Sequence, residues 1–212
     1  MEIALRGIGV SPGIAIGPAL NFGVRSLGVP KYEVEDKEAE RKRFEEAIEA
    51  TRRDLQALYE RTAVGLGARH AEIFKAHQLL LDDVTLQEEF TNRLESEALN
   101  AEYIVDDLIM RYSRMLGTVD DPLFRERAQD FSDVGARILG HLLDTDLDNL
   151  EHLERPSIVV AHDLSPSDTA KMDLANVLGL ATDVSGPTSH TAILARAFQV
   201  PAVVGLKYVG AH

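Results

Sequence analysis

The apolar side chains of residues 31–145 recur every three or four positions, and this spacing predicts a region built of helices. The clearest run places six side chains on one face of a single long helix: Phe44, Ile48, Thr51, Leu55, Leu58 and Thr62. We expect Gly65 and Gly67 to end this helix, because glycine is a poor helix former. An apolar face of this length requires other helices to cover it, so we expect a bundle.

Three further helices are expected to complete a four-helix bundle. The second carries an apolar stripe of Ile73, His77, Leu80 and Val84. It breaks near residues 82–85, where the capping-box pattern of residues 85–88 predicts a new start that runs to about residue 97. The third begins after the N-cap Asn100, ends at Gly117 and faces inward with Ile104, Leu108, Tyr112 and Met115. The fourth begins at Asp121 and Pro122 and buries Phe124, Ala128, Phe131, Val134, Ile138 and Leu142.

The pattern changes after the helical region. Residues 157–161, 177–181 and 202–205 are short and apolar, which indicates buried strands, and they alternate with helices expected after Ser165 and over residues 189–198. The Gly- and Ile-rich start, residues 3–20, does not suit a bundle and is grouped with these strands. We therefore expect two domains in an α+β arrangement: a discontinuous α/β domain of residues 1–30 and 146–212, and an inserted helical bundle of residues 31–145.

The composition is that of a globular protein, with 45% hydrophobic and 27% charged residues. No apolar run approaches the ~20 residues of a membrane span, and no signal peptide is recognisable, so we expect a cytoplasmic protein without a membrane partner. The absence of cysteine excludes disulfides and thiolate metal sites. The net charge of −13 argues against nucleic acid, and residues 31–154 alone hold 30 acidic and 16 basic side chains. That excess indicates either simple solvation or a basic partner surface.

Among seven histidines, His190 stands apart because a loop rich in small residues, 183–188, meets the start of a helix there. Imidazole attacks phosphorus only when neutral, and a helix N-terminus disfavours its protonated form by roughly 0.3–1 kcal/mol. The same N-terminus offers N–H groups to a bound phosphoryl dianion. Gly186 allows close backbone approach, and Thr188, Ser189 and Thr191 add hydroxyl donors. The alternative is a capped turn in which the histidine is incidental.

Residues 186–196, followed by Val200-Pro-Ala-Val-Val-Gly205, resemble the phosphohistidine signature of the enzyme I and pyruvate phosphate dikinase group. Residues 163–169 and 9–17 resemble further parts of enzyme I of the bacterial phosphoenolpyruvate-dependent phosphotransferase system, and residues 72–83 and 125–130 resemble its helical region. This resemblance implies a phosphoenolpyruvate-protein phosphotransferase in which His190 is phosphorylated and the hydroxyl of Thr169 hydrogen-bonds it. The phosphoryl group would come from phosphoenolpyruvate on a C-terminal domain of the parent chain, with Mg²⁺ in the full-length enzyme. It would pass to a histidine of a small, HPr-like phosphocarrier protein, in sugar transport or in a regulatory branch.

The resemblance also implies a carrier-docking face on the helical region, formed by Glu72, Ile73, Lys75, His77, Leu80, Asp83 and Arg127. Ile73 and Leu80 lie on the apolar stripe, so they are alternatively part of the bundle core. No metal site and no cofactor are expected in this chain, whose α/β domain is expected to lack its last strands and which would perform only the exchange with the carrier.

Two positions depart from the pattern of enzyme I. The loop reads Ser185-Gly186-Pro187 where Gly-Gly-Arg is common, so a nearby cation is expected to be missing. Val84-Thr85 replaces an acidic pair that often follows the break in the second helix. Two other readings remain open: the swivelling domain of a dikinase or phosphoenolpyruvate synthase, and a non-enzymatic acidic adaptor.

Overall fold

A computed structural model describes residues 4–22, 28–145, 150–151, 153 and 155–207. The chain divides into two compact units. Met1–Ser26 and Asp148–His212 form one, which we call the α/β unit, and Leu27–Leu147 form the other, which we call the helical unit. The fold class expected from the sequence, an α/β domain with an inserted helical bundle, is confirmed.

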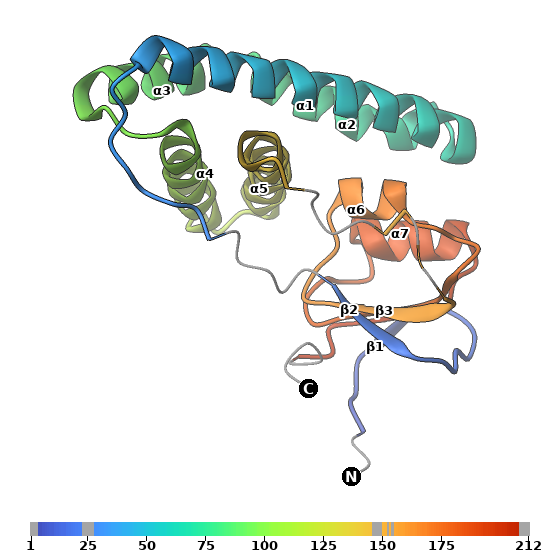
Figure 1. Ribbon diagram of the computed structural model, residues 1–212. Helices are drawn as coiled ribbons and strands as arrows, with labels where there is room; N and C mark the ends of the chain where they lie inside the picture. The colour runs from blue at the N-terminus through green and yellow to red at the C-terminus, as the bar shows by residue number, and fades with distance from the viewer. Residues whose placement is uncertain (1–3, 23–27, 146–149, 152, 154, 208–212) are drawn as a thin grey trace. The chain divides into compact units, whose positions relative to one another are not determined.

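The described part of the helical unit contains five helices: α1 (Lys37–Leu66), α2 (Ala68–Leu81), α3 (Val84–Glu97), α4 (Ala101–Gly117) and α5 (Pro122–Leu143). In Figure 1, α1 lies alongside α2, and α4 lies alongside α5, as two helical pairs within this unit. The second of the four expected helices is thus two separate helices, α2 and α3.

Helix α1 follows its predicted apolar face closely. All six side chains of that face are buried, together with Glu40 and Ala47. Asp36 caps the start by accepting a hydrogen bond from the Ala39 amide at 2.9 Å. The helix continues through Gly65 and ends at Gly67, whose φ of 91° lies in the left-handed region that glycine adopts without strain.

The stripe predicted for the second helix is wrong in part. The side chains that α2 buries are Ala71, Phe74, His77 and Leu81, whereas Ile73 and Leu80 are half-buried and Val84 is exposed. The buried face of α2 is therefore rotated about the helix axis from the predicted face. At its start α3 is capped by Asp83 and not by the predicted Thr85, because the Asp83 carboxylate accepts from the amides of Thr85 and Leu86 at 2.8 and 3.4 Å.

Two inward positions predicted for the later helices are also wrong. Met115 and Phe124 are exposed, and each lies in a terminal turn, where a helix extends past its packing partners. The predicted starts are confirmed: Asn100 precedes α4, and Asp121 caps α5 by accepting from the Leu123 amide at 2.8 Å.

The α/β unit contains one mixed five-stranded sheet in the order β1-β5-β4-β3-β2. Its strands are β1 (Ile8–Ser11), β2 (Ala19–Phe22), β3 (Ser157–Ala161), β4 (Val177–Thr182) and β5 (Ala202–Val204). The strands β2 to β5 run parallel, and β1 pairs antiparallel with β5. The N-terminal residues thus supply both edge strands, as their grouping with the later strands required.

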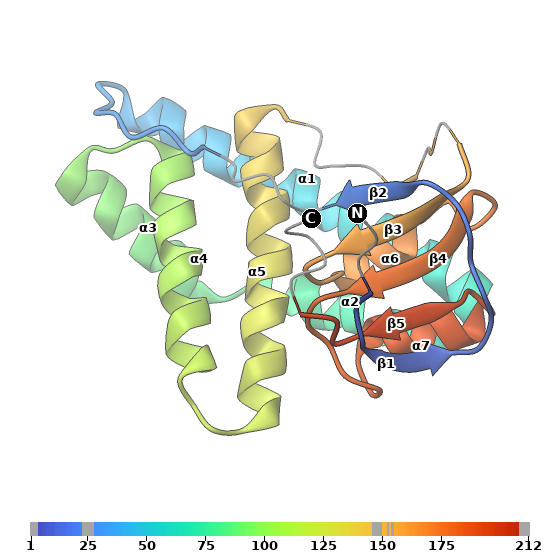
Figure 2. The same cartoon turned by 90° about the horizontal axis from the view of Figure 1, so that it is seen from below.

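Two helices, α6 (Pro166–Lys171) and α7 (His190–Ala197), follow β3 and β4. Both cover the same face of the sheet, as Figures 1 and 2 show from two directions. Side chains of this layer, among them Leu164, Ala192 and Ala195, pack with Val159 and Leu180 of the strands into the core of the unit. This places the loops before α6 and α7 together at the carboxyl ends of β3 and β4, where ligand sites of parallel sheets form.

Among the described residues, no helix combines the length and the apolarity that crossing a membrane requires.

Candidate functional site

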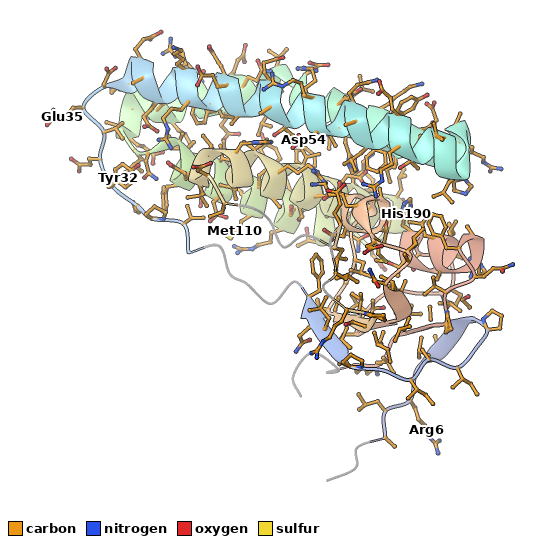
Figure 3. All side chains as sticks on the ribbon, turned by 45° about the vertical axis from the view of Figure 1, so that its right-hand side comes forward. Arg6, Tyr32, Glu35, Asp54, Met110 and His190 are labelled. Carbon is orange, nitrogen blue, oxygen red and sulfur yellow. The ribbon has the colours of Figure 1, made fainter. Side chains whose placement is uncertain are left out.

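His190 is the first residue of α7, on the face of the sheet that carries both helices of the α/β unit, and its side chain is half-buried (Figure 3). Ser189 caps the helix, because its Oγ accepts from the Ala192 amide at 3.2 Å. The turn before it is closed by the Ser189 amide, which donates to the Gly186 carbonyl at 3.0 Å. The predicted position of His190, where a loop meets the start of a helix, is therefore confirmed.

The predicted phosphate donors fall into two groups. Thr188 is exposed, and Ser189 can still donate its hydroxyl proton while it caps α7. The space beside Gly186 is open, because no described residue other than its two chain neighbours lies within 4 Å of the place where a Cβ would stand. Thr191 is different: it is buried, and its hydroxyl donates to the Leu164 carbonyl at 3.3 Å. The predicted phosphate contact of Thr191 is thus contradicted, because this side chain points inward and ties α7 to the loop before α6.

Thr169 lies on α6, the helix that contacts α7, and is buried. Its hydroxyl donates to the carbonyls of Ser165 and Pro166 at 3.1 and 2.9 Å. A hydroxyl whose proton is used in this way keeps its lone pairs for accepting a hydrogen bond. Helix α6 is itself held by a capping box between Ser165 and Asp168.

The loop after β4 is hydrogen-bonded to the loop after β3, a connection that sequence reasoning missed. The amides of Asp183 and Val184 donate to the carbonyls of Ala161 and His162 at 3.1 and 3.0 Å. The Ser185 hydroxyl donates to Asp163 Oδ1 at 2.6 Å. The bonded residues lie about twenty positions apart in the sequence. The connection could have been predicted from the polar side chains that follow directly after two neighbouring parallel strands.

A cation does contact this loop, contrary to the expectation drawn from Pro187. The guanidinium group of Arg196, on the last turn of α7, donates to the carbonyls of Pro187 at 3.1 Å and of Val10 at 3.4 Å. Arg196 therefore links the loop to β1 from the other end of the helix.

The seven residues predicted to contact a partner have different environments. Glu72 and Lys75 are exposed and form an ion pair at 2.7 Å, and Arg127 on α5 is exposed. Ile73 and Leu80 are half-buried, so neither is part of the bundle core. Asp83 is occupied as the cap of α3.

His77 is fully buried, which contradicts its predicted contact with a partner. Its Nε2 lies 3.1 Å from Asp130 Oδ1 and its Nδ1 lies 3.6 Å from Asp133 Oδ2, both on α5. This histidine therefore joins α2 to α5 inside the bundle.

Exposed apolar side chains lie on the same helices as the exposed predicted residues. Leu79 on α2 is 70% exposed, and Leu123 on α5 is 60% exposed. Both were missed: Leu79 falls outside the stripe predicted for the second helix, and Leu123 is not among the positions considered for the fourth.

In the part of the chain that the structure describes, no three His, Asp or Glu side chains gather as a possible metal site.

Two family models match the chain in succession. Residues 6–127 match "PEP-utilising enzyme, N-terminal", and residues 153–210, which include His190 and its loop, match "PEP-utilising enzyme, mobile domain". The chain belongs to the PEP-utilising enzyme family.

Relatives within the PEP-utilising enzymes cover the whole chain. It is 40% identical over 211 residues to the phosphoenolpyruvate-protein phosphotransferase of Bacillus sp. (strain S), and 41% identical over 211 residues to that of Listeria monocytogenes. The alignments span 100% of this chain and 36% and 37% of those relatives, so the chain spans little more than a third of their length. The resemblance to phosphoenolpyruvate-protein phosphotransferases drawn from the motifs is thus confirmed.

Two solved structures share the fold of this chain. An NMR solution structure of an Enzyme I protein superimposes with a TM-score of 0.76 at 40% identity, over 98% of this chain and 85% of that one. An N-terminal domain of "Enzyme 1 - Nitrogen" gives a TM-score of 0.66 at 27% identity, over 95% of this chain and 83% of that one.

Proposed function

We propose that this chain is the phosphohistidine-bearing part of a phosphoenolpyruvate-protein phosphotransferase, and that His190 carries the phosphoryl group. The observation that supports this most is the position of His190, at the capped start of α7 and within the match to the mobile domain. A ring nitrogen there meets the positive end of a helix, which favours an attached dianion.

The reaction takes two steps through His190. In the first, the phosphorus–oxygen bond of phosphoenolpyruvate breaks as a phosphorus–nitrogen bond to the imidazole forms, and pyruvate leaves after protonation. In the second, that bond breaks as a new one forms on a histidine of a small carrier protein. The donor site for phosphoenolpyruvate belongs to the longer protein, with Mg²⁺ as its metal.

Thr169 is proposed to orient the imidazole. Since its hydroxyl proton is donated to α6 carbonyls, the oxygen is left to accept an N–H from one ring nitrogen. That bond would hold the other nitrogen unprotonated and available to phosphorus.

The carrier is proposed to dock on α2 and the start of α5. Exposed Leu79 and Leu123 supply apolar contact, and exposed Glu72, Lys75 and Arg127 supply charges around it. Packing of His77 against Asp130 holds these two helices together beneath the face. An apolar centre with a charged rim is typical of transient interfaces. We further propose a cytoplasmic location, where such carriers act.

The test is to incubate the chain with phosphorylated carrier and locate the label. We expect an acid-labile adduct in the wild type that is absent from His190→Ala. The matched control is His162→Ala, because His162 is an exposed histidine in the neighbouring loop and lies 3.5 Å from Asp183. A label that persists in His190→Ala, or that disappears in His162→Ala while His190 is intact, contradicts the proposal.

A further inference from the structure

Ser185 has a backbone conformation that serine rarely adopts. Its φ is 91°, in the left-handed region that glycine enters without strain. A non-glycine residue held there is strained, and it persists only where its surroundings enforce the conformation. The question is what enforces it at this position.

Packing does not hold the loop around Ser185. Val184, Pro187 and Thr188 are exposed, and the space beside Gly186 is open. Exposed side chains bury little apolar surface, so polar contacts must keep the loop in place.

The contact made by the Ser185 side chain is a short hydrogen bond to Asp163. Its Oγ lies 2.6 Å from Asp163 Oδ1, a length typical of a hydroxyl donating to a carboxylate. The same carboxylate oxygen accepts from the Leu164 amide at 2.9 Å, so it is anchored to the loop before α6. The bond therefore fastens the loop after β4 to a fixed point on the loop after β3.

The fastened end of this loop leads directly to the histidine. Four residues after Ser185, the Ser189 amide bonds the Gly186 carbonyl and the Ser189 hydroxyl caps α7, whose first residue is His190. A change of the backbone conformation at Ser185 would therefore move the residues from which this turn and cap are built.

We propose that Asp163 and Ser185 form a clamp that positions the loop for phosphorylation of His190, a proposal that rests on the proposed function. The two are positioning residues: Asp163 holds Ser185 at positive φ, and neither touches the phosphoryl group. If this is the whole role of the carboxylate, a residue that adopts positive φ unaided makes it dispensable.

Phosphoramidate is the probe, because it transfers its phosphoryl group to an imidazole nitrogen and releases ammonia without a protein partner. The rate of acid-labile labelling of His190 is measured in the full chain. We expect Ser185→Ala and Asp163→Asn to slow labelling by about tenfold or more, the scale set by losing one charge-assisted hydrogen bond. Ser185→Gly should label at the wild-type rate, and adding Asp163→Asn to it should change the rate by less than about twofold.

The matched control is Ser157→Ala, because Ser157 is a buried serine of the same unit whose hydroxyl donates to the Arg155 carbonyl at 3.0 Å. It should label at the wild-type rate, and thermal unfolding of each variant identifies any that does not fold. The clamp is overturned if the Asp163→Asn, Ser185→Gly double variant is as slow as Asp163→Asn alone, or if both single variants Ser185→Ala and Asp163→Asn label normally. An unlabelled His190 in the wild type overturns the proposed function itself, and the clamp with it.

Discussion

At the scale of single residues, two threonine hydroxyls near His190 donate their hydrogen bonds to different parts of the chain. Thr191 and Thr169 are both buried, and both donate to main-chain carbonyls. Thr191 bonds a carbonyl outside its own helix and so joins two elements, whereas Thr169 bonds carbonyls of its own first turn. The proposed mechanism uses the lone pairs of the Thr169 hydroxyl oxygen, which accept an N–H from His190, and it assigns no such role to Thr191.

Thr169→Val is expected to slow phosphoryl transfer to His190 by about tenfold or more, because a charge-assisted hydrogen bond of roughly 1.5–3 kcal/mol is lost. Stability should change by less than about 1 kcal/mol, since valine fills the same space and the Ser165 carbonyl keeps its bond from the Thr169 amide at 3.1 Å. The measurements are the labelling rate and the melting temperature. Thr169→Ser, which keeps the hydroxyl, should transfer normally, and an unimpaired valine variant would exclude the proposed role.

At the scale of helices, the exposed surface of α2 is the proposed docking element. Asp83 is a poor probe of it, because replacing an N-cap destabilises the helix by about 1 kcal/mol regardless of any partner. Leu79→Ala is expected to weaken carrier binding by about fivefold or more, as the loss of a central apolar contact does.

Glu72→Lys is expected to slow association with the carrier, because it reverses a charge at the rim of the same face. Titration calorimetry and stopped-flow measurements provide the affinity and the rate. Glu45→Lys makes the same change at an exposed site on α1 and serves as the control. Equal effects of the two reversals would place the docking face elsewhere.

A partly buried ionic network joins α1 to α4. Arg43 of α1 bonds Glu40 at 2.7 Å and also bonds Glu102, while Glu40 accepts from the Ala101 amide at 2.8 Å. Burial alone would raise the pKa of Glu102, but hydrogen bonds from Arg43, from its own backbone and from Asn100 outweigh burial and hold the pKa below its ordinary value. Glu102 thus stabilises the fold above its ordinary pKa, and this contribution is lost as the pH falls through the lowered value.

Glu102→Gln is therefore expected to reduce the free energy of unfolding by about 1.5–3 kcal/mol at neutral pH. The difference from the wild type should begin to shrink as the pH falls below the ordinary glutamate pKa of 4.5, because the unfolded wild-type chain then binds a proton that the folded chain does not. Urea denaturation at several pH values measures it, with Glu45→Gln as an exposed control. A loss that is the same at pH 7 and at pH 3.5 would show that ionisation of Glu102 is not the cause.

At the scale of the whole molecule, charge is distributed unevenly along the chain. Residues 31–154 contain 30 acidic and 16 basic side chains, against a chain total of −13. If this excess steers a basic carrier, affinity and association rate should both fall as salt shortens the Debye length from ~10 Å at 0.1 M to ~3 Å at 1 M. Titrations over this range measure both, and values that do not change with salt would mean that the negative charge serves solvation alone.

Much of the fold, and the position of His190 where a loop meets a helix, could be predicted from the sequence, because the signals concerned are local. The strand over residues 157–161, the buried face of α1, the caps at Asp121 and Ser165, and the junction at His190 are each specified by neighbours within a few positions. Periodicity and capping act over one or two turns, so a single segment carries the whole signal.

Only the tertiary structure decided which distant group each side chain meets. His77 is buried because Asp130 and Asp133 approach it from α5, and Ser185 keeps a strained backbone while it bonds Asp163 on the loop after β3. These partners lie between about twenty and fifty-six positions away along the chain. A local pattern indicates only whether a side chain is apolar or polar. Its burial and its hydrogen bonds depend on which distant segment packs against it, and that is determined by the fold of the whole chain.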